Sequence, residues 1–177
     1  MKSLIKILRL VSILIIIFCV SFFLFYKITQ KDSQPLILTQ SVINQPLPKA
    51  HLVDVSGNQL DDDKLRRGKV ILIFSTLDCK YCDEENDFLK TEVGKRQDVN
   101  FYYVIPFGPK DKQLREAQNK YAFAAYYDDG SRLSRSLQLL QVPIMVYLED
   151  GVIKKTWIDS IAYNHREDEF NNWLSRL

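Results

Sequence analysis

Two cysteines, Cys79 and Cys82, stand between a strongly apolar run and an amphipathic segment. The run at 69–74 is almost continuously apolar and rich in β-branched residues, as is typical of a central strand buried on both faces. Residues 83–94 then have helical spacing and end at a glycine. The sequence therefore predicts a buried strand, a turn that carries a CxxC pair, and a helix.

Beyond residue 47 the chain alternates between strand-like and helix-like segments. A short hairpin is expected first, because 51–55 alternates in hydropathy and the following Ser-Gly-Asn favours a turn. Glu149-Asp150-Gly151 is a strong signal for a second hairpin. The order of elements predicts an α/β fold with one mixed sheet and helices on both faces. Further strands are expected at 99–105, 123–127, 144–148 and 152–157, and helices at 61–65, 111–121 and around Leu133, Leu137 and Leu140.

A final helix is predicted to begin at Asn164, whose side chain can cap it, with Glu167 three residues further on. Its apolar residues recur at helical spacing and give it one apolar face. These residues are Phe170, Trp173, Leu174 and Leu177.

An uncharged run at 10–26 precedes the folded part of the chain, with basic residues on both sides. It predicts a membrane-spanning helix at the short end of the usual range of about 17–25 residues. The alternative is a cleaved signal peptide, but Phe22 to Lys27 lacks the small residues that a signal peptidase needs. The excess of positive charge before the run favours a cytoplasmic N-terminus. We therefore expect a cytoplasmic segment at 1–9, an anchor in the lipid bilayer at 10–26, a linker at 27–46 and an extracytoplasmic domain at 47–177.

Charge and length exclude some classes of function. With 24 basic and 22 acidic residues, the formal net charge of +2 provides no strong field for nucleic acid, and nucleic-acid binding is set aside. The 177 residues leave room for one ordinary domain and a short accessory segment.

A CxxC pair at the start of a helix is suited to disulfide exchange. The free N–H groups and the positive end of the helix dipole stabilise the thiolate of Cys79, which is the nucleophilic form. Cys82, one turn further in, can resolve a mixed disulfide with a substrate and leave a Cys79–Cys82 disulfide. Lys80 favours the thiolate and Asp78 disfavours it, so both are expected to tune the pair.

Two other uses of the pair remain open at this point. It can form a structural disulfide, or it can be half of a zinc site. A four-ligand zinc site needs two more ligands, and only His51 and His165 follow the predicted anchor, without metal-motif spacing. We therefore predict no metal and no cofactor.

Three motifs follow one another in the chain. The first is the apolar strand run from Gly68 to Phe74, and the second is the CxxC pair, Cys79 and Cys82. The third is Val142-Pro143, which precedes a hairpin strand with Gly151. This pattern resembles the thioredoxin superfamily, specifically its membrane-tethered TlpA/ResA group. The resemblance covers about 47–177 and implies a thioredoxin-like fold with an N-terminal β-hairpin extension. It also implies that Pro143 is cis and lies against the disulfide, where adjacent backbone groups pair with a substrate strand.

Glu85 lies three residues after Cys82 and shares its face of the predicted helix. The TlpA/ResA group has a glutamate at the matching position, beneath the cysteines, where it can accept or donate the proton of the inner thiol. Burial would raise the pKa of such a carboxyl group toward neutrality and fit it for that role. The alternative is a solvated helix glutamate like Glu84.

The resemblance also implies a substrate and a redox partner. It implies an extracytoplasmic thiol–disulfide oxidoreductase that acts as a reductase on secreted or periplasmic proteins, for example apocytochrome c. A thiol-reducing membrane protein would supply its electrons. Tyr81, Val142 and Pro143 are the expected substrate contacts. The sequence departs from the group at Asp78, where Trp is common, and at Lys80-Tyr81, where a Pro-containing dipeptide is common.

Two rival functions are retained. Thr76-Leu77-Asp78-Cys79 mimics the Thr-x-x-Cys loop of peroxiredoxins, although Leu72 stands where their proline should be. The non-enzymatic alternative is a thioredoxin-like binding module whose disulfide is merely structural.

Overall fold

The computed structural model describes residues 42–92, 96 and 98–177. These residues belong to one compact unit, Leu38–Leu177. The predicted anchor at 10–26 and most of the predicted linker lie outside the described residues. Within the part of the chain that is described, no helix is long and apolar enough to cross a membrane.

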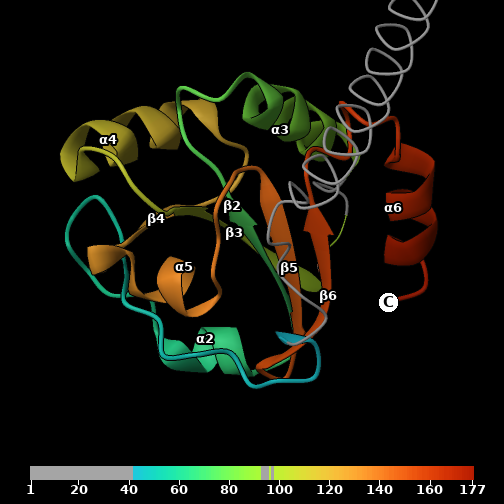
Figure 1. The fold of residues 1–177 in the computed structure, drawn as a ribbon, viewed down its shortest axis with the longest axis horizontal. Helices are drawn as coiled ribbons and strands as arrows, with labels where there is room; N and C mark the ends of the chain where they lie inside the picture. Colours follow the sequence, from blue (N-terminus) through green and yellow to red (C-terminus); the bar gives the residue numbers. More distant parts are fainter. Residues whose placement is uncertain (1–41, 93–95, 97) are drawn as a thin grey trace, which may run out of the picture. The chain divides into compact units, whose positions relative to one another are not determined.

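Six strands form one mixed sheet: β1 Leu52–Val53, β2 Lys69–Phe74, β3 Val99–Ile105, β4 Ala125–Asp128, β5 Ile144–Glu149 and β6 Val152–Ile158. Their spatial order is β1-β4-β3-β2-β5-β6. Figure 1 labels all of these strands except β1. β2 pairs in parallel with β3 and antiparallel with β5, so it is the central strand that its apolar run predicted. Every residue of β2 after Lys69 is buried.

Five α-helices are described: α2 Asp62–Arg66, α3 Lys80–Glu92, α4 Lys110–Lys120, α5 Arg132–Ser136 and α6 Glu167–Leu174. On one face of the sheet, α3 and α6 pack Leu89 and Phe170 into the same core as Ile71, and α4 joins them there. On the other face, α2 and α5 pack Leu65 and Leu133 into a second core. Successive residues of β2 serve the two cores alternately, which explains why the whole strand is apolar.

The predicted first hairpin forms, but it belongs to the main sheet. The Leu60 N–H donates to the Leu52 carbonyl, and Val53 forms an isolated bridge with Gln59. β1 has only two residues and pairs antiparallel with β4. The segment is therefore the edge of the central sheet rather than a separate hairpin extension.

The predicted helix around Leu133, Leu137 and Leu140 is wrong at Leu140. Leu133 and Leu137 are buried, but α5 ends at Ser136 and Leu140 is 68% exposed. Gln138 has a φ of 54°, a left-handed conformation that interrupts the helical path. Leu140 consequently lies in the loop that leads to Val142.

The prediction that Asn164 caps the last helix is also wrong. α6 begins at Glu167, and Arg166 occupies the position before it. The Asn164 side-chain amide instead donates to the Ser160 carbonyl at 2.8 Å, within a turn that follows β6. The Asn164 side chain therefore stabilises a local turn instead of capping the helix.

Asp128 anchors α5 from the end of β4. Its fully buried carboxylate accepts hydrogen bonds from the N–H groups of Leu133 and Ser134, at 3.1 and 2.7 Å, and from the Ser134 hydroxyl at 2.6 Å. These bonds satisfy N–H groups near the start of α5 that have no partner inside the helix. Because the chain runs from α5 into the Val142-Pro143 segment, Asp128 helps to fix the loop that faces the cysteines.

Candidate active site

Three separate segments meet at one edge of the sheet. Phe74, the last residue of β2, pairs with Ile144 at the start of β5. Ile144 pairs in turn with Ile158 at the end of β6. The CxxC turn after β2, the Val142-Pro143 segment before β5 and the turn after β6 therefore lie at the same edge.

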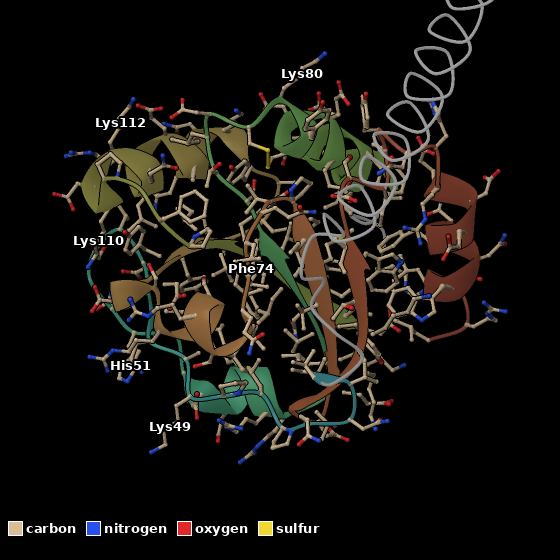
Figure 2. The ribbon with its side chains drawn as sticks, in the orientation of Figure 1. Lys49, His51, Phe74, Lys80, Lys110 and Lys112 are labelled. Atoms are coloured by element: carbon tan, nitrogen blue, oxygen red, sulfur yellow. A yellow bond between two sulfur atoms is a disulfide. The ribbon has the colours of Figure 1, made fainter. Side chains whose placement is uncertain are left out.

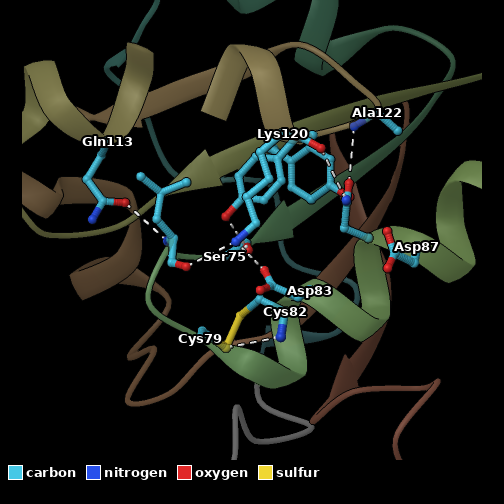
Figure 3. Close-up of polar contacts among 12 residues, drawn as sticks. Ser75, Cys79, Cys82, Asp83, Asp87, Gln113, Lys120 and Ala122 are labelled. Carbon is cyan, nitrogen blue, oxygen red and sulfur yellow. Dashed lines mark hydrogen bonds and ion pairs between the residues drawn. A yellow bond between two sulfur atoms is a disulfide. The ribbon is translucent and has the colours of Figure 1, made fainter. Parts of the chain in front are cut away.

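Cys79 immediately precedes α3, and Cys82 lies in its first turn. A disulfide joins them, with their Cα atoms 5.2 Å apart (Figure 3). The Cys82 N–H donates to the Sγ atom of Cys79 at 3.1 Å. Cys79 is half-buried, whereas Cys82 is only 1% exposed. Cys79 is therefore the sulfur that a partner can reach, and the start of α3 is positioned to stabilise its thiolate after reduction.

Pro143 stands opposite the disulfide, in the conformation that the resemblance implied. The Val142–Pro143 peptide bond is cis. The carbonyl oxygen of Val142 lies 3.9 Å from the Sγ atom of Cys79. Pro143 is buried and Val142 is half-buried. A polypeptide that approaches Cys79 will meet the Val142 backbone at the same time.

The two charged neighbours of Cys79 are both exposed. The Lys80 side chain is 82% exposed and points outward from the start of α3 (Figure 2). Its Nζ atom lies 3.9 Å from Oε1 of Glu84. Water screens charges in such positions, so each has a weaker effect on the thiol than a buried charge would have. The tuning of Cys79 by Asp78 and Lys80 stays a prediction.

Glu85 is buried, unlike its neighbour Glu84. It is 1% exposed, and its Oε2 atom accepts hydrogen bonds from the Ser160 hydroxyl at 2.8 Å and from the Ala162 N–H at 3.1 Å. Oε1 has no hydrogen-bond partner among the described residues. Burial raises the pKa of Glu85 above its ordinary value, and the bonds to Oε2 oppose this only in part. A buried carboxyl group with one free oxygen can gain or lose a proton there.

Side chains of α4 hold the loop that carries Cys79, a feature that the sequence did not reveal. The Leu77 N–H donates to Oε1 of Gln113 at 3.2 Å, and Nζ of Lys120 donates to the Leu77 carbonyl at 3.1 Å (Figure 3). Nζ of Lys120 also lies 2.5 Å from Oδ1 of Asp83, in the first turn of α3. α4 thus holds the CxxC turn on both sides of the disulfide.

A second group of buried polar side chains ties α3 to α4 and β3. Oδ1 of Asn86 accepts hydrogen bonds from the Tyr103 hydroxyl at 2.8 Å and from the Ala122 N–H at 3.1 Å, while its amide donates to the Lys120 carbonyl at 3.3 Å. These partners are far from Asn86 in the sequence, so no local motif could have identified them. Satisfied buried networks of this kind fix the orientation of the elements they join.

A pocket of about 250 Å³ opens beside the cysteines. It combines the predicted substrate contacts, including Tyr81, with residues of the turn after β6 that the sequence analysis did not select. Ser160 lines the pocket and also donates to Glu85, so it connects the pocket with the buried acid. The lining residues are Tyr81, Val142, Pro143, Asp159, Ser160, Tyr163 and Asn164.

Solved structures share this fold, although no family model and no curated protein matches the chain. A secreted disulfide oxidoreductase of Mycobacterium tuberculosis, homologous to DsbE of E. coli, matches with a TM-score of 0.60 and 17% identity, over 71% of this chain and 94% of that one. StoA from Bacillus subtilis matches with a TM-score of 0.54 and 21% identity, over 70% and 97%. A putative protein disulfide isomerase from Bacteroides thetaiotaomicron matches with a TM-score of 0.59 and 19% identity, over 73% and 87%.

Proposed function

The chain has a thioredoxin-like fold, and we propose that it is an extracytoplasmic thiol–disulfide oxidoreductase that reduces protein disulfides. One observation carries the proposal. A half-buried Cys79 at the start of α3 faces the Val142 carbonyl and is joined to a buried Cys82. A purely structural disulfide has no need of an accessible outer sulfur at a helix N-terminus.

The proposed reaction moves two electrons from the enzyme to its client. The Cys79 thiolate attacks one sulfur of a client disulfide, and the other client sulfur leaves as a thiolate that takes up a proton. Cys82 then loses its proton and attacks Sγ of Cys79, which releases the second client sulfur as a thiol. The client disulfide has been reduced, and the Cys79–Cys82 pair has been oxidised.

We assign the proton of Cys82 to Glu85. The two residues lie on the same face of α3 because they are three positions apart. The raised pKa of Glu85 makes its carboxylate a better base than an exposed glutamate, and Oε1 is free to receive the proton. Ser160 acts as a positioning residue, since its hydroxyl holds the other oxygen of Glu85.

The client is proposed to bind as an extended segment across Val142 and Pro143, with Tyr81 at its side. The edge of the sheet where the CxxC turn lies, called the disulfide edge below, also carries exposed large apolar side chains. Phe107, after β3, and Leu140, before Val142, are 50% and 68% exposed, and Tyr81 is 44% exposed. Exposed apolar side chains that gather around one site are typical of protein-binding surfaces. This favours a protein client over a small thiol.

The location and the partners follow from the anchor predicted at 10–26. We propose that this helix holds the domain outside the cytoplasm, where a membrane thiol reductant restores the dithiol. A secreted or periplasmic protein is then the client, and apocytochrome c is the example that the TlpA/ResA resemblance suggests.

Thiol labelling in intact cells tests the location and the direction together. A membrane-impermeant maleimide is expected to label Cys79 without added reductant, because the donor keeps the pair reduced. Both chains carry Cys19→Ser, which removes the third cysteine of the sequence. The control is Ser3→Cys in a chain that also has Cys79→Ser and Cys82→Ser, and only a permeant maleimide should label it. Labelling of Cys79 by the permeant reagent alone contradicts the location. A pair that is fully oxidised at steady state, with no cellular reductant able to cycle it, contradicts the reductase direction.

A further inference from the structure

The pocket beside the disulfide differs in chemistry from the apolar surface around it. Two phenol rings, Tyr81 and Tyr163, line it with their centroids 4.5 Å apart in an edge-to-face arrangement. They are 44% and 52% exposed, so they keep area for a partner. Asp159 adds an exposed carboxylate to the same lining. The pocket of about 250 Å³ is smaller than the roughly 300–1,000 Å³ that holds a drug-sized ligand, and so fits a single side chain.

We propose that this pocket binds a lysine or arginine side chain of the client, next to the cysteine that Cys79 attacks. The inference rests on the proposed function, because it requires a polypeptide client. The pocket shares Val142 and Pro143 with the surface that faces Cys79. A side chain that enters the pocket therefore belongs to the residues adjacent to the client cysteine.

The aromatic rings and the carboxylate favour the same kind of ligand. A cation near an aromatic ring is attracted by the negative face of the ring, within about 6 Å of its centroid. Asp159 supplies a full negative charge beside the rings. Its Oδ1 atom accepts a hydrogen bond from the Gln141 amide, which fixes the carboxylate without neutralising it. An acidic client side chain would meet repulsion in the same place.

Arg166 is close enough to Asp159 to offset part of its negative charge, but Arg166 and Lys80 are each also paired with a glutamate. Lys80 lies 3.9 Å from Glu84, and Arg166 bonds to Glu169 at 2.9 Å. None of the described residues that line the pocket is a lysine or an arginine. Asp78, next to Cys79, is exposed and adds to the negative field of the disulfide edge. A basic client segment matches this distribution of charge.

The test measures how fast the pre-reduced full-length chain reacts with a set of short peptides. Each peptide carries one cysteine in a mixed disulfide with thionitrobenzoate, whose release is followed by its absorbance. Lysine, norleucine or glutamate is placed at each of the two positions on either side of the cysteine. At low ionic strength the lysine peptide is expected to react about tenfold faster than the glutamate peptide at the preferred position, with norleucine between them. Added salt should reduce this ratio.

Asp159→Asn is the decisive variant. Asp159 has a φ of 66°, a left-handed conformation that asparagine adopts as readily, so the turn is preserved. In this variant the lysine peptide should react only about twofold faster than the glutamate peptide, because the lysine rate falls and the glutamate rate rises. Tyr163→Leu should lower the ratio of the lysine rate to the norleucine rate about threefold. Glu149→Gln, an exposed carboxylate at the opposite end of β5, is the matched control and should change neither ratio.

Two results overturn the inference. The first is a wild-type chain that reduces the three peptides at equal rates at every position. The second is an Asp159→Asn variant whose rates with all three peptides fall together, since the residue then has only a structural role. A wild-type chain that releases no thionitrobenzoate from any peptide contradicts the proposed function itself.

Discussion

Replacing Cys79 with serine is expected to lower the kcat/KM of disulfide reduction by about a thousandfold or more, because a serine hydroxyl is not a nucleophile toward sulfur. The half-buried Cys79 is the sulfur that a client can reach. Purified full-length Cys79→Ser, assayed with a disulfide-bonded protein substrate, provides the measurement. Activity close to that of the wild type would show that the disulfide is structural and would favour the binding-module alternative.

Cys82→Ser should separate the two steps of the reaction. Cys79 still attacks the client, but the mixed disulfide is no longer resolved and accumulates as a covalent complex. The complex should appear on a non-reducing gel, disappear with reductant, and be absent from the double variant Cys79→Ser/Cys82→Ser. A peroxiredoxin behaves differently: its Cys82→Ser variant would consume peroxide in the first turnover without any disulfide client.

Glu85→Gln should lower the rate at which Cys82 resolves the mixed disulfide by about a hundredfold at neutral pH, the lower end of the usual contribution of a general base. The substitution keeps the shape of the side chain, and the Gln oxygen can still accept from Ser160 and Ala162. Glu84→Gln is the matched control, because Glu84 directly precedes Glu85 in α3 and its side chain is 38% exposed. Single-turnover kinetics with a mixed-disulfide substrate measures the step directly.

The pH dependence gives Glu85 a second signature. In the proposed mechanism the Glu85 carboxylate accepts the proton of Cys82, so the wild-type resolution rate should rise with pH through the raised pKa of Glu85. The resolution rate of Glu85→Gln should lack that rise, and its pH dependence should reflect only the ionisation of the Cys82 thiol. Equal pH profiles for the wild type and Glu85→Gln would remove Glu85 from the mechanism.

As pH rises, the stability of the protein should change in the opposite direction to the resolution rate. The pKa of Glu85 is raised in the folded state above the ordinary value of 4.5, so the native protein binds more protons than the unfolded chain between the two pKa values. The free energy of unfolding should therefore fall as pH rises through this window in the wild type, and fall less in Glu85→Gln. Denaturant unfolding of the two proteins at several pH values measures the difference.

The strand–turn–helix unit around the cysteines could be predicted from sequence because its signals are local. The apolar run of β2, the CxxC spacing and the helical spacing after it each indicate one element. The order of elements then predicted a mixed sheet covered on both faces, which the structure confirms. Pro143 could be selected through the resemblance, and Glu85 through its helical spacing from Cys82 together with the resemblance. The cis bond and the burial of Glu85 agree with what the resemblance implied.

Contacts between distant segments could not be predicted in the same way. Lys120 reaches Leu77 and Asp83 from α4, and Ser160 reaches Glu85 from the turn after β6. No spacing rule connects such pairs, since their proximity is created by the pairing of strands. Asn164 shows a related limit, because a capping pattern in the sequence carries no information about a competing turn.

The reduction potential of the Cys79–Cys82 pair in the full-length chain decides whether the protein reduces or oxidises disulfides. It is measured by equilibrating the protein in dithiothreitol buffers of graded composition and counting free thiols by alkylation. A reductase of protein disulfides requires a potential near the strongly reducing end of the thioredoxin range, about −270 mV, and this is the predicted result. A potential near about −120 mV would identify an oxidant and rule out the proposed reductase function.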